Sequence, residues 1–93
     1  MIYNLIILDL AIEDAQDAFD YYEKHQVNLG NELANLIEYI HENPLHFKTI
    51  KQNYRQAILD NFPYLIVYYI SDNTIYIQRV FHAKRNPKKK FKQ

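Results

Sequence analysis

The seven residues from Tyr64 to Ile70 constrain the fold of this chain more than any other segment. They read Tyr-Leu-Ile-Val-Tyr-Tyr-Ile, with an apolar or aromatic side chain at every position. A strand that is apolar on both faces of its pleat belongs inside a sheet that is covered on both sides. Turn-forming residues flank it at 60–63 and at 71–73. We therefore expect a central strand.

Two further strands are predicted beside it, from Tyr54 to Leu59 and from Thr74 to Phe81. Connections of three or four residues join strands that are neighbours and run antiparallel. The run from Ile2 to Leu8 is short and nearly all apolar, which fits a buried strand better than a helix. The sheet is therefore expected to have four strands.

Two amphipathic helices are predicted between the first strand and the other three. The first runs from Leu10 to His25, with Asp9 as its N-cap, and its apolar residues recur at spacings of three and four: Ala11, Ala15, Ala18, Phe19 and Tyr22. The second is carried by Leu29, Leu33, Leu36, Ile37 and Ile40. It should end by Asn43, because a residue that precedes a proline disfavours the helical region. Their short link makes the pair an antiparallel hairpin.

This order of elements predicts an α+β fold, β-α-α-β-β-β, in which a helical hairpin packs on a four-stranded sheet. Because 93 residues rarely form two cores, we expect one domain over 1–93, with 82–93 as a basic C-terminal tail. The chain has no cysteine, no signal-peptide pattern and no apolar run near the ~20 residues of a membrane span. A cytoplasmic location without a membrane partner is expected.

Charge is divided unevenly along the chain, although the formal net charge is +0. Residues 1–42 carry nine acidic side chains and one basic one, whereas residues 43–93 carry ten basic and two acidic ones. The last fifteen residues hold seven of the cations: Arg79, Lys84, Arg85, Lys88, Lys89, Lys90 and Lys92. This division indicates that the basic end meets a polyanion or an acidic protein. A solvated basic tail is the alternative.

Several short motifs follow one another along the chain, and their order is more specific than any one of them. They are Tyr21-Tyr22 in the first helix, Asn43-Pro44 after the second helix, Tyr54-Arg55 at the start of a strand, and the runs 62–69 and 80–87. Over essentially the whole chain they resemble the RelE/ParE superfamily of bacterial toxins. The resemblance implies a type II toxin–antitoxin (plasmid stabilisation) module, in which a cognate antitoxin holds the toxin inactive.

Members of this superfamily differ in target. The resemblance implies either a ParE-like toxin that poisons DNA gyrase or a RelE-like enzyme that cuts messenger RNA on the ribosome. RelE-like members carry an arginine in the strand that reads Tyr-Arg-Leu-Val-Tyr, and this chain has Leu65 there. Leucine cannot neutralise a phosphate, so we favour the gyrase branch and expect no enzyme. A small interaction domain without toxicity is a further alternative.

If the protein is instead a metal-independent endoribonuclease, its catalytic residues are expected to be Arg55, His82 and Arg85. Cations would stabilise the phosphate, and a histidine titrates near neutral pH and can transfer a proton. The structural alternatives are that His82 caps the last strand and that Arg55 pairs with an acid of the helical hairpin. We expect no cofactor and no metal, because Glu38, His41 and Glu42 share one helix face without a second such motif opposite.

Five further residues are predicted to bind the target or a nucleic acid: Arg79, Lys84, Lys88, Lys89 and Lys90. Lysines along a tail bind phosphates with little sequence preference. An extended antitoxin segment that covers residues 79–92 would block such contacts. Arg79 is expected to share a strand face with Ile75, Ile77 and Phe81, and an ion pair within the fold is its structural alternative. The sequence leaves a homodimer open.

Overall fold

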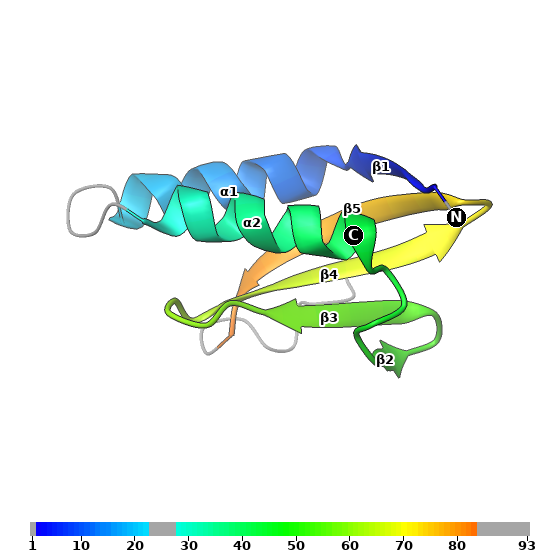
Figure 1. Ribbon diagram of the computed structural model, residues 1–93. Coiled ribbons are helices and arrows are strands. Elements are labelled where there is room, and N and C mark those ends of the chain that lie inside the picture. The colour runs from blue at the N-terminus through cyan, green and yellow to red at the C-terminus, as the bar shows by residue number, and fades with distance from the viewer. Residues whose placement is uncertain (1, 23–27, 84–93) are drawn as a thin grey trace.

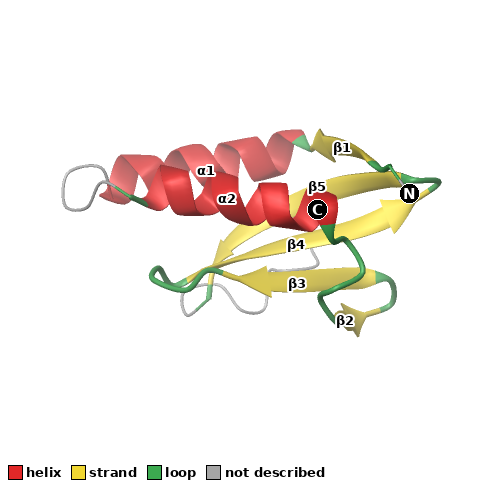
Figure 2. Ribbon diagram, in the orientation of Figure 1, coloured by secondary structure: helices red, strands yellow, loops and turns green. Residues whose placement is uncertain are grey.

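The computed structural model describes residues 2–22 and 28–83. Two helices and five strands follow one another in the order β1 (Asn4–Ile7), α1 (Asp9–Tyr22), α2 (Leu29–Glu42), β2 (Thr49–Lys51), β3 (Tyr54–Ile58), β4 (Tyr64–Ser71) and β5 (Thr74–His82). The two helices lie side by side across one face of the sheet (Figures 1 and 2). The predicted α+β class and the helical hairpin are confirmed.

The five strands form one sheet in the order β1-β5-β4-β3-β2. The central position of β4 is confirmed, since the side chains from Tyr64 to Tyr68 are all buried. Strands β3, β4 and β5 are antiparallel neighbours, as the short connections predicted. The prediction of four strands was wrong by one. β2 has only three residues, all exposed, and so carries no hydrophobic period that would reveal it.

The first strand, β1, lies at the edge of the sheet and runs parallel to β5. Its expected burial was wrong, because Ile6 and Ile7 are 44% and 39% exposed. A strand paired on one side only, at the end of a sheet, is covered less than a central one. Its parallel direction follows from the helical hairpin, which carries the chain back before the antiparallel strands begin.

Helix α1 begins at Asp9, one residue before the predicted start. The Leu8 carbonyl accepts hydrogen bonds from the N–H groups of Ala11 and Ile12, so Leu8 and not Asp9 occupies the capping position. Asp9 lies instead in the first turn, where the helix dipole favours a carboxylate. The predicted end at His25 falls outside the described residues. Helix α2 ends at Glu42, with Asn43 as its C-cap, as the following proline predicted.

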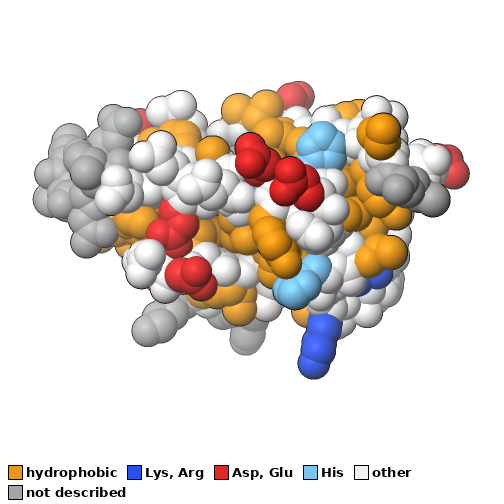
Figure 3. All heavy atoms as spheres, in the orientation of Figure 1, with side chains coloured by type: hydrophobic (Ala, Val, Ile, Leu, Met, Phe, Trp, Pro, Cys, Tyr) orange, Lys and Arg blue, Asp and Glu red, His pale blue; other side chains and the backbone are white. Residues whose placement is uncertain are grey.

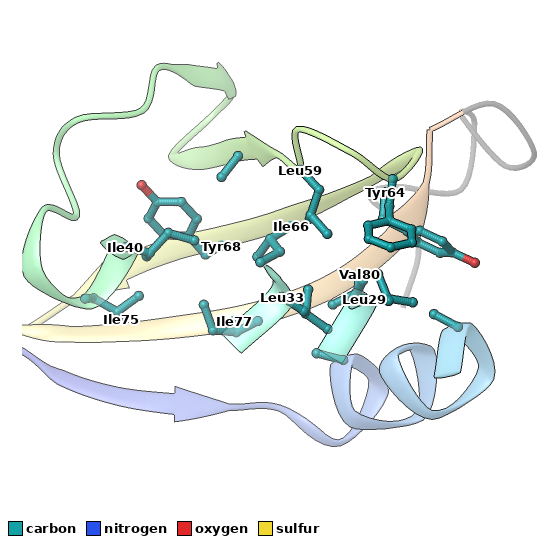
Figure 4. Packing of buried hydrophobic residues seen from close by; sticks show 14 residues of the cluster. Leu29, Leu33, Ile40, Leu59, Tyr64, Ile66, Tyr68, Ile75, Ile77 and Val80 are labelled. Carbon is teal, nitrogen blue, oxygen red and sulfur yellow. The ribbon is translucent and has the colours of Figure 1, made fainter. Parts of the chain in front are cut away.

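The main core lies between the helical hairpin and the face of the sheet that we call the inner face. Ile40 of α2 belongs to one buried cluster with Ile66 and Tyr68 of β4 and Ile77 of β5, all 0% exposed (Figure 4). The Tyr68 hydroxyl donates a 2.8 Å hydrogen bond to the carbonyl oxygen of Pro44. This bond ties the chain after α2 to the middle of the sheet.

A bulge in β5 changes which side chains face the helices. Val67 pairs with Arg79 but Tyr68 pairs with Ile77, so Gln78 has no partner in the β4–β5 register. Ile77 and Val80 therefore both lie in the inner core, while Phe81 packs with Leu65 and Val67 on the opposite, outer face. The expectation that Arg79 shares a face with Ile75 and Ile77 was wrong, because an extra residue reverses the alternation.

Candidate functional site

Arg79 is fixed within the fold by Asp14 of α1. Its guanidinium donates hydrogen bonds to both carboxylate oxygens, from Nε at 2.7 Å and from Nη2 at 3.0 Å. One of these oxygens also accepts the backbone N–H of Val80 at 3.0 Å. Both side chains are nearly covered, at 17% and 16% exposure. The guanidinium lies 4.6 Å from the centre of the Phe81 ring, so Arg79 does share a face with Phe81, as expected.

Local topology explains this contact. β1 ends at Ile7, which pairs with Ile77, so the part of β5 after Ile77 has no strand on the side away from β4. Helix α1 follows β1 directly and places Asp14 at that edge. The hydrogen bonds with Asp14 raise the pKa of Arg79, against the opposing effect of burial, so the guanidinium stays charged. The geometry supports the structural alternative for this residue.

Arg55 lies on β3, where its Nη1 donates a short hydrogen bond to the carbonyl oxygen of Phe47. It pairs across the sheet with Tyr68. Burial raises the pKa of Tyr68 to about 12, and the positive charge of Arg55 lowers it in part. No acidic side chain of the described helices is seen to bind Arg55; it holds the segment between α2 and β2 by a main-chain carbonyl instead.

His82 is the last residue of β5 and pairs with Tyr64. The two rings meet edge to face, with centroids 5.2 Å apart. The next residue, Ala83, donates its N–H to the carbonyl oxygen of Pro63 at 2.7 Å, which closes this end of the sheet. The surroundings of His82 are thus those of a strand end, beside the turn before β4.

The structure does not bring Arg55 and His82 together. Arg55 is level with Tyr68, and His82 is level with Tyr64, four residues away along β4. Four residues of strand span about 13 Å, and β3 and β5 are separated by a further strand, or about 10 Å. Lys84, Arg85, Lys88, Lys89 and Lys90 lie outside the described residues, so the placement of these candidates stays a prediction.

Leu65, which stands where RelE-like members have an arginine, is 5% exposed on the outer face. It packs there with Val67 and Phe81, and Tyr54 lies partly buried against them. The side chain therefore belongs to an apolar cluster. A cation at this position would have to enter that cluster or displace it.

Three tyrosines form a row across the outer face that sequence reasoning missed. Tyr76 of β5 stacks on Tyr69 of β4 with ring centroids 5.0 Å apart, and Tyr54 of β3 meets Tyr69 edge to face at 5.7 Å. Burial raises the pKa of Tyr69, and its two tyrosine neighbours raise it further. Asp72 and Asn73, both with positive φ, form the two-residue turn that sets this register. Counting back from that turn pairs Tyr69 with Tyr76.

Two hollows lie on the helical side of the molecule. One, of about 240 Å³, runs between α1 and α2, where the small residues Ala11, Ala15, Gly30 and Ala34 leave room. The other, which we call the α2–β3 cleft, has a volume of about 450 Å³ and is lined by Glu32, Asn35, Leu36, Tyr39, Phe47, Ile58, Leu59, Asp60 and Asn61. Acidic side chains gather over this face of the molecule (Figure 3).

Within residues 2–22 and 28–83, no three His, Asp or Glu side chains gather as a metal site would require. Neither described helix is long and apolar enough to cross a membrane.

A helical hairpin on a mixed five-stranded sheet, with Arg79 of β5 bound to Asp14 of the first helix, makes this chain a small α+β domain. Residues 5–87 match the family described as the ParE toxin of type II toxin–antitoxin system, parDE. The chain therefore belongs to the ParE toxin family, which confirms the resemblance to the RelE/ParE superfamily.

Two solved structures are similar to the chain in fold. A chain of the chromosomal ParDE TA system from P. aeruginosa superposes with a TM-score of 0.77 at 12% identity, covering 89% of this chain and 98% of that one. A chain of the E. coli DinJ-YafQ toxin-antitoxin complex superposes with a TM-score of 0.67 at 15% identity, covering 88% and 93%. At such identities the likeness shows the fold alone. No curated protein sequence matches the chain.

Proposed function

We propose that this protein is a growth-inhibiting toxin that acts on DNA gyrase by binding, and that a cognate antitoxin neutralises it. The observation that carries the choice of target is Leu65, which is 5% exposed within an apolar cluster on the outer face. A RelE-like ribonuclease needs a cation there to stabilise the crowded phosphate of its transition state.

The positions of the other catalytic candidates support the same choice. Metal-independent cleavage of RNA needs a proton acceptor, a proton donor and cations around one phosphate. Arg55 binds the Phe47 carbonyl, and His82 lies at the other end of β4, two strands away. We assign binding of the target to Lys84, Lys88, Lys89 and Lys90, because lysines along a tail bind phosphates with little sequence preference.

The first experiment adds the purified protein to two reconstituted reactions. In the first, gyrase supercoils relaxed plasmid, and we expect the toxin to inhibit supercoiling or to trap cleaved DNA. In the second, ribosomes translate a defined message, and we expect the message to stay intact.

The variant His82→Ala separates the two classes of activity. Cuts in the message that need ribosomes and vanish in His82→Ala would identify a ribonuclease and overturn the gyrase proposal. If neither reaction responds to a folded protein that also fails to slow growth in cells, the chain is an interaction domain without toxicity.

A further inference from the structure

The α2–β3 cleft has the shape of a docking groove. One wall is a single face of α2, because Glu32, Asn35, Leu36 and Tyr39 are spaced by three or four residues. From Glu32 to Tyr39 this wall is about 10 Å long. The facing wall is the end of β3 with the turn that follows it, from Ile58 to Asn61. In the described sheet β2 pairs only with Tyr54 and Arg55 of β3, so Ile58 has β4 on one side and no paired strand on the other.

The ends of the cleft are held by contacts within the fold. At one end, the Glu32 carboxylate accepts the backbone N–H of Asn61 at 2.8 Å and its side-chain amide at 3.0 Å. At the other end, the Tyr39 ring meets Phe47 edge to face with centroids 5.8 Å apart. The groove is therefore preformed between α2 and the turn, and binding does not have to order it first.

The lining combines apolar surface with negative charge. Tyr39 is 40% exposed, and Leu36 and Phe47 are half-buried beside it, so the cleft offers apolar surface on its α2 side. Glu32 and Asp60 are the charged residues among those that line the cleft, and both are acids. Glu32 is bound by neutral donors only, so its charge is not cancelled by the contacts with Asn61. A complementary ligand would carry an apolar side chain next to a cation.

We propose that the α2–β3 cleft is a docking site for a segment of the antitoxin in which an aliphatic or aromatic side chain stands beside a lysine or arginine. This inference rests on the proposed function, since it takes the antitoxin as the partner. The apolar side chain lies against Leu36, Tyr39 and Phe47, and the cation lies beside Asp60 and Glu32. The antitoxin thereby holds the toxin by an anchor in an acidic cleft on its helical side.

The test measures the affinity of the purified toxin for the antitoxin that is encoded beside it, by calorimetry at two salt concentrations. Asp60→Lys places a cation in the cleft, and we expect binding about tenfold weaker, with a smaller dependence on salt. Tyr39→Ser removes apolar surface from the α2 wall, and we expect binding about fivefold weaker with the salt dependence unchanged. Thermal melts establish that each variant is folded.

Glu38→Lys is the matched control, because Glu38 is an exposed acid of α2 that does not line the cleft. We expect this variant to bind like the unchanged protein. In addition, exchanging single lysines and arginines of the antitoxin for glutamate should reveal one position at which the exchange restores binding to Asp60→Lys.

The outcomes are distinguishable. If the unchanged toxin does not bind the antitoxin, the proposed function fails in its choice of partner. If it binds, and the two cleft variants bind equally well or Glu38→Lys loses as much as Asp60→Lys, the docking site is refuted. If instead the purified toxin self-associates without the antitoxin and becomes monomeric in Asp60→Lys, the cleft binds a second copy of the chain. The docking site for the antitoxin would then also be refuted.

Discussion

Replacing Asp14 by alanine should destabilise this protein more than replacing any other acidic residue of α1. The carboxylate accepts two hydrogen bonds from Arg79 and one from the N–H of Val80. Its removal leaves a guanidinium and a main-chain N–H without these partners in a region where both side chains are less than one fifth exposed. We expect the variant to fold but to melt early.

The magnitude follows from the three bonds. A hydrogen bond to a charged group contributes about 1.5–3 kcal/mol, and breaking a mostly buried ion pair from one side costs about 3–5 kcal/mol. Partial exposure lets water reach the guanidinium, so we take the lower end, about 3 kcal/mol. For a domain of this size that loss lowers the melting temperature by roughly 12–24 °C.

The assay is urea unfolding followed by circular dichroism, with Asp17→Ala as the control on the same helix. Asp17 is exposed, and we expect its replacement to change the free energy of unfolding by less than about 0.5 kcal/mol. A double-mutant cycle with Arg79→Ala should give a coupling energy of about 2 kcal/mol. If the two substitutions change the free energy of unfolding additively, or if Asp14→Ala costs less than about 1 kcal/mol, the ion pair does not stabilise the fold as we describe.

Three further predictions concern single residues. Tyr68→Phe leaves the Pro44 carbonyl without its bond and should cost about 1–2 kcal/mol in chemical unfolding. Because the pKa of Tyr68 is about 12 in the fold and 10.0 ordinarily, its contribution is complete below pH 10 and is lost as the pH rises towards 12. Between pH 10 and pH 12 the free energy of unfolding should therefore fall less steeply with pH in Tyr68→Phe than in the unchanged protein. Equal slopes would contradict the assignment. Gly30→Ala should raise stability by about 0.5–1 kcal/mol, since an added Cβ would meet Phe19 at an ordinary 3.6 Å; a lower melting temperature would argue against that packing. Leu65→Arg buries a cation in the outer cluster and should cost at least about 3 kcal/mol without creating RNA cleavage, whereas a stable and ribosome-dependent nuclease would reverse our choice of target.

The sequence predicted those parts of the fold in which a periodic pattern and a turn signal agree. The apolar run of β4 and the turns beside it fixed the three antiparallel strands, and Pro44 fixed the end of α2. Elements whose residues show no hydrophobic periodicity could not be predicted in this way. β2 is three exposed residues, and the position of β1 at the edge depends on pairing with β5, across almost the whole chain.

The candidate site was harder to predict because its geometry depends on one extra residue. Gln78 has no partner opposite β4, and this bulge sends Arg79 to the outer face, where it reaches Asp14 around the edge of β5. A strict alternation of faces cannot show such a shift. The sequence did suggest that the head of Arg79 seeks a carboxylate, but the choice of Asp14 needed the sheet order.

The same geometry separates two roles for Arg79 in toxicity. If the arginine serves only to join β5 to α1, Asp14→Ala and Arg79→Ala should weaken growth inhibition equally whenever their stabilities are equal. If the guanidinium also meets the target, Arg79→Ala should lose more toxicity than Asp14→Ala. Comparing growth curves at temperatures where both variants are equally folded decides between these roles. Because the guanidinium binds both carboxylate oxygens of Asp14 and the ring of Phe81 lies beside it, we expect the two curves to coincide.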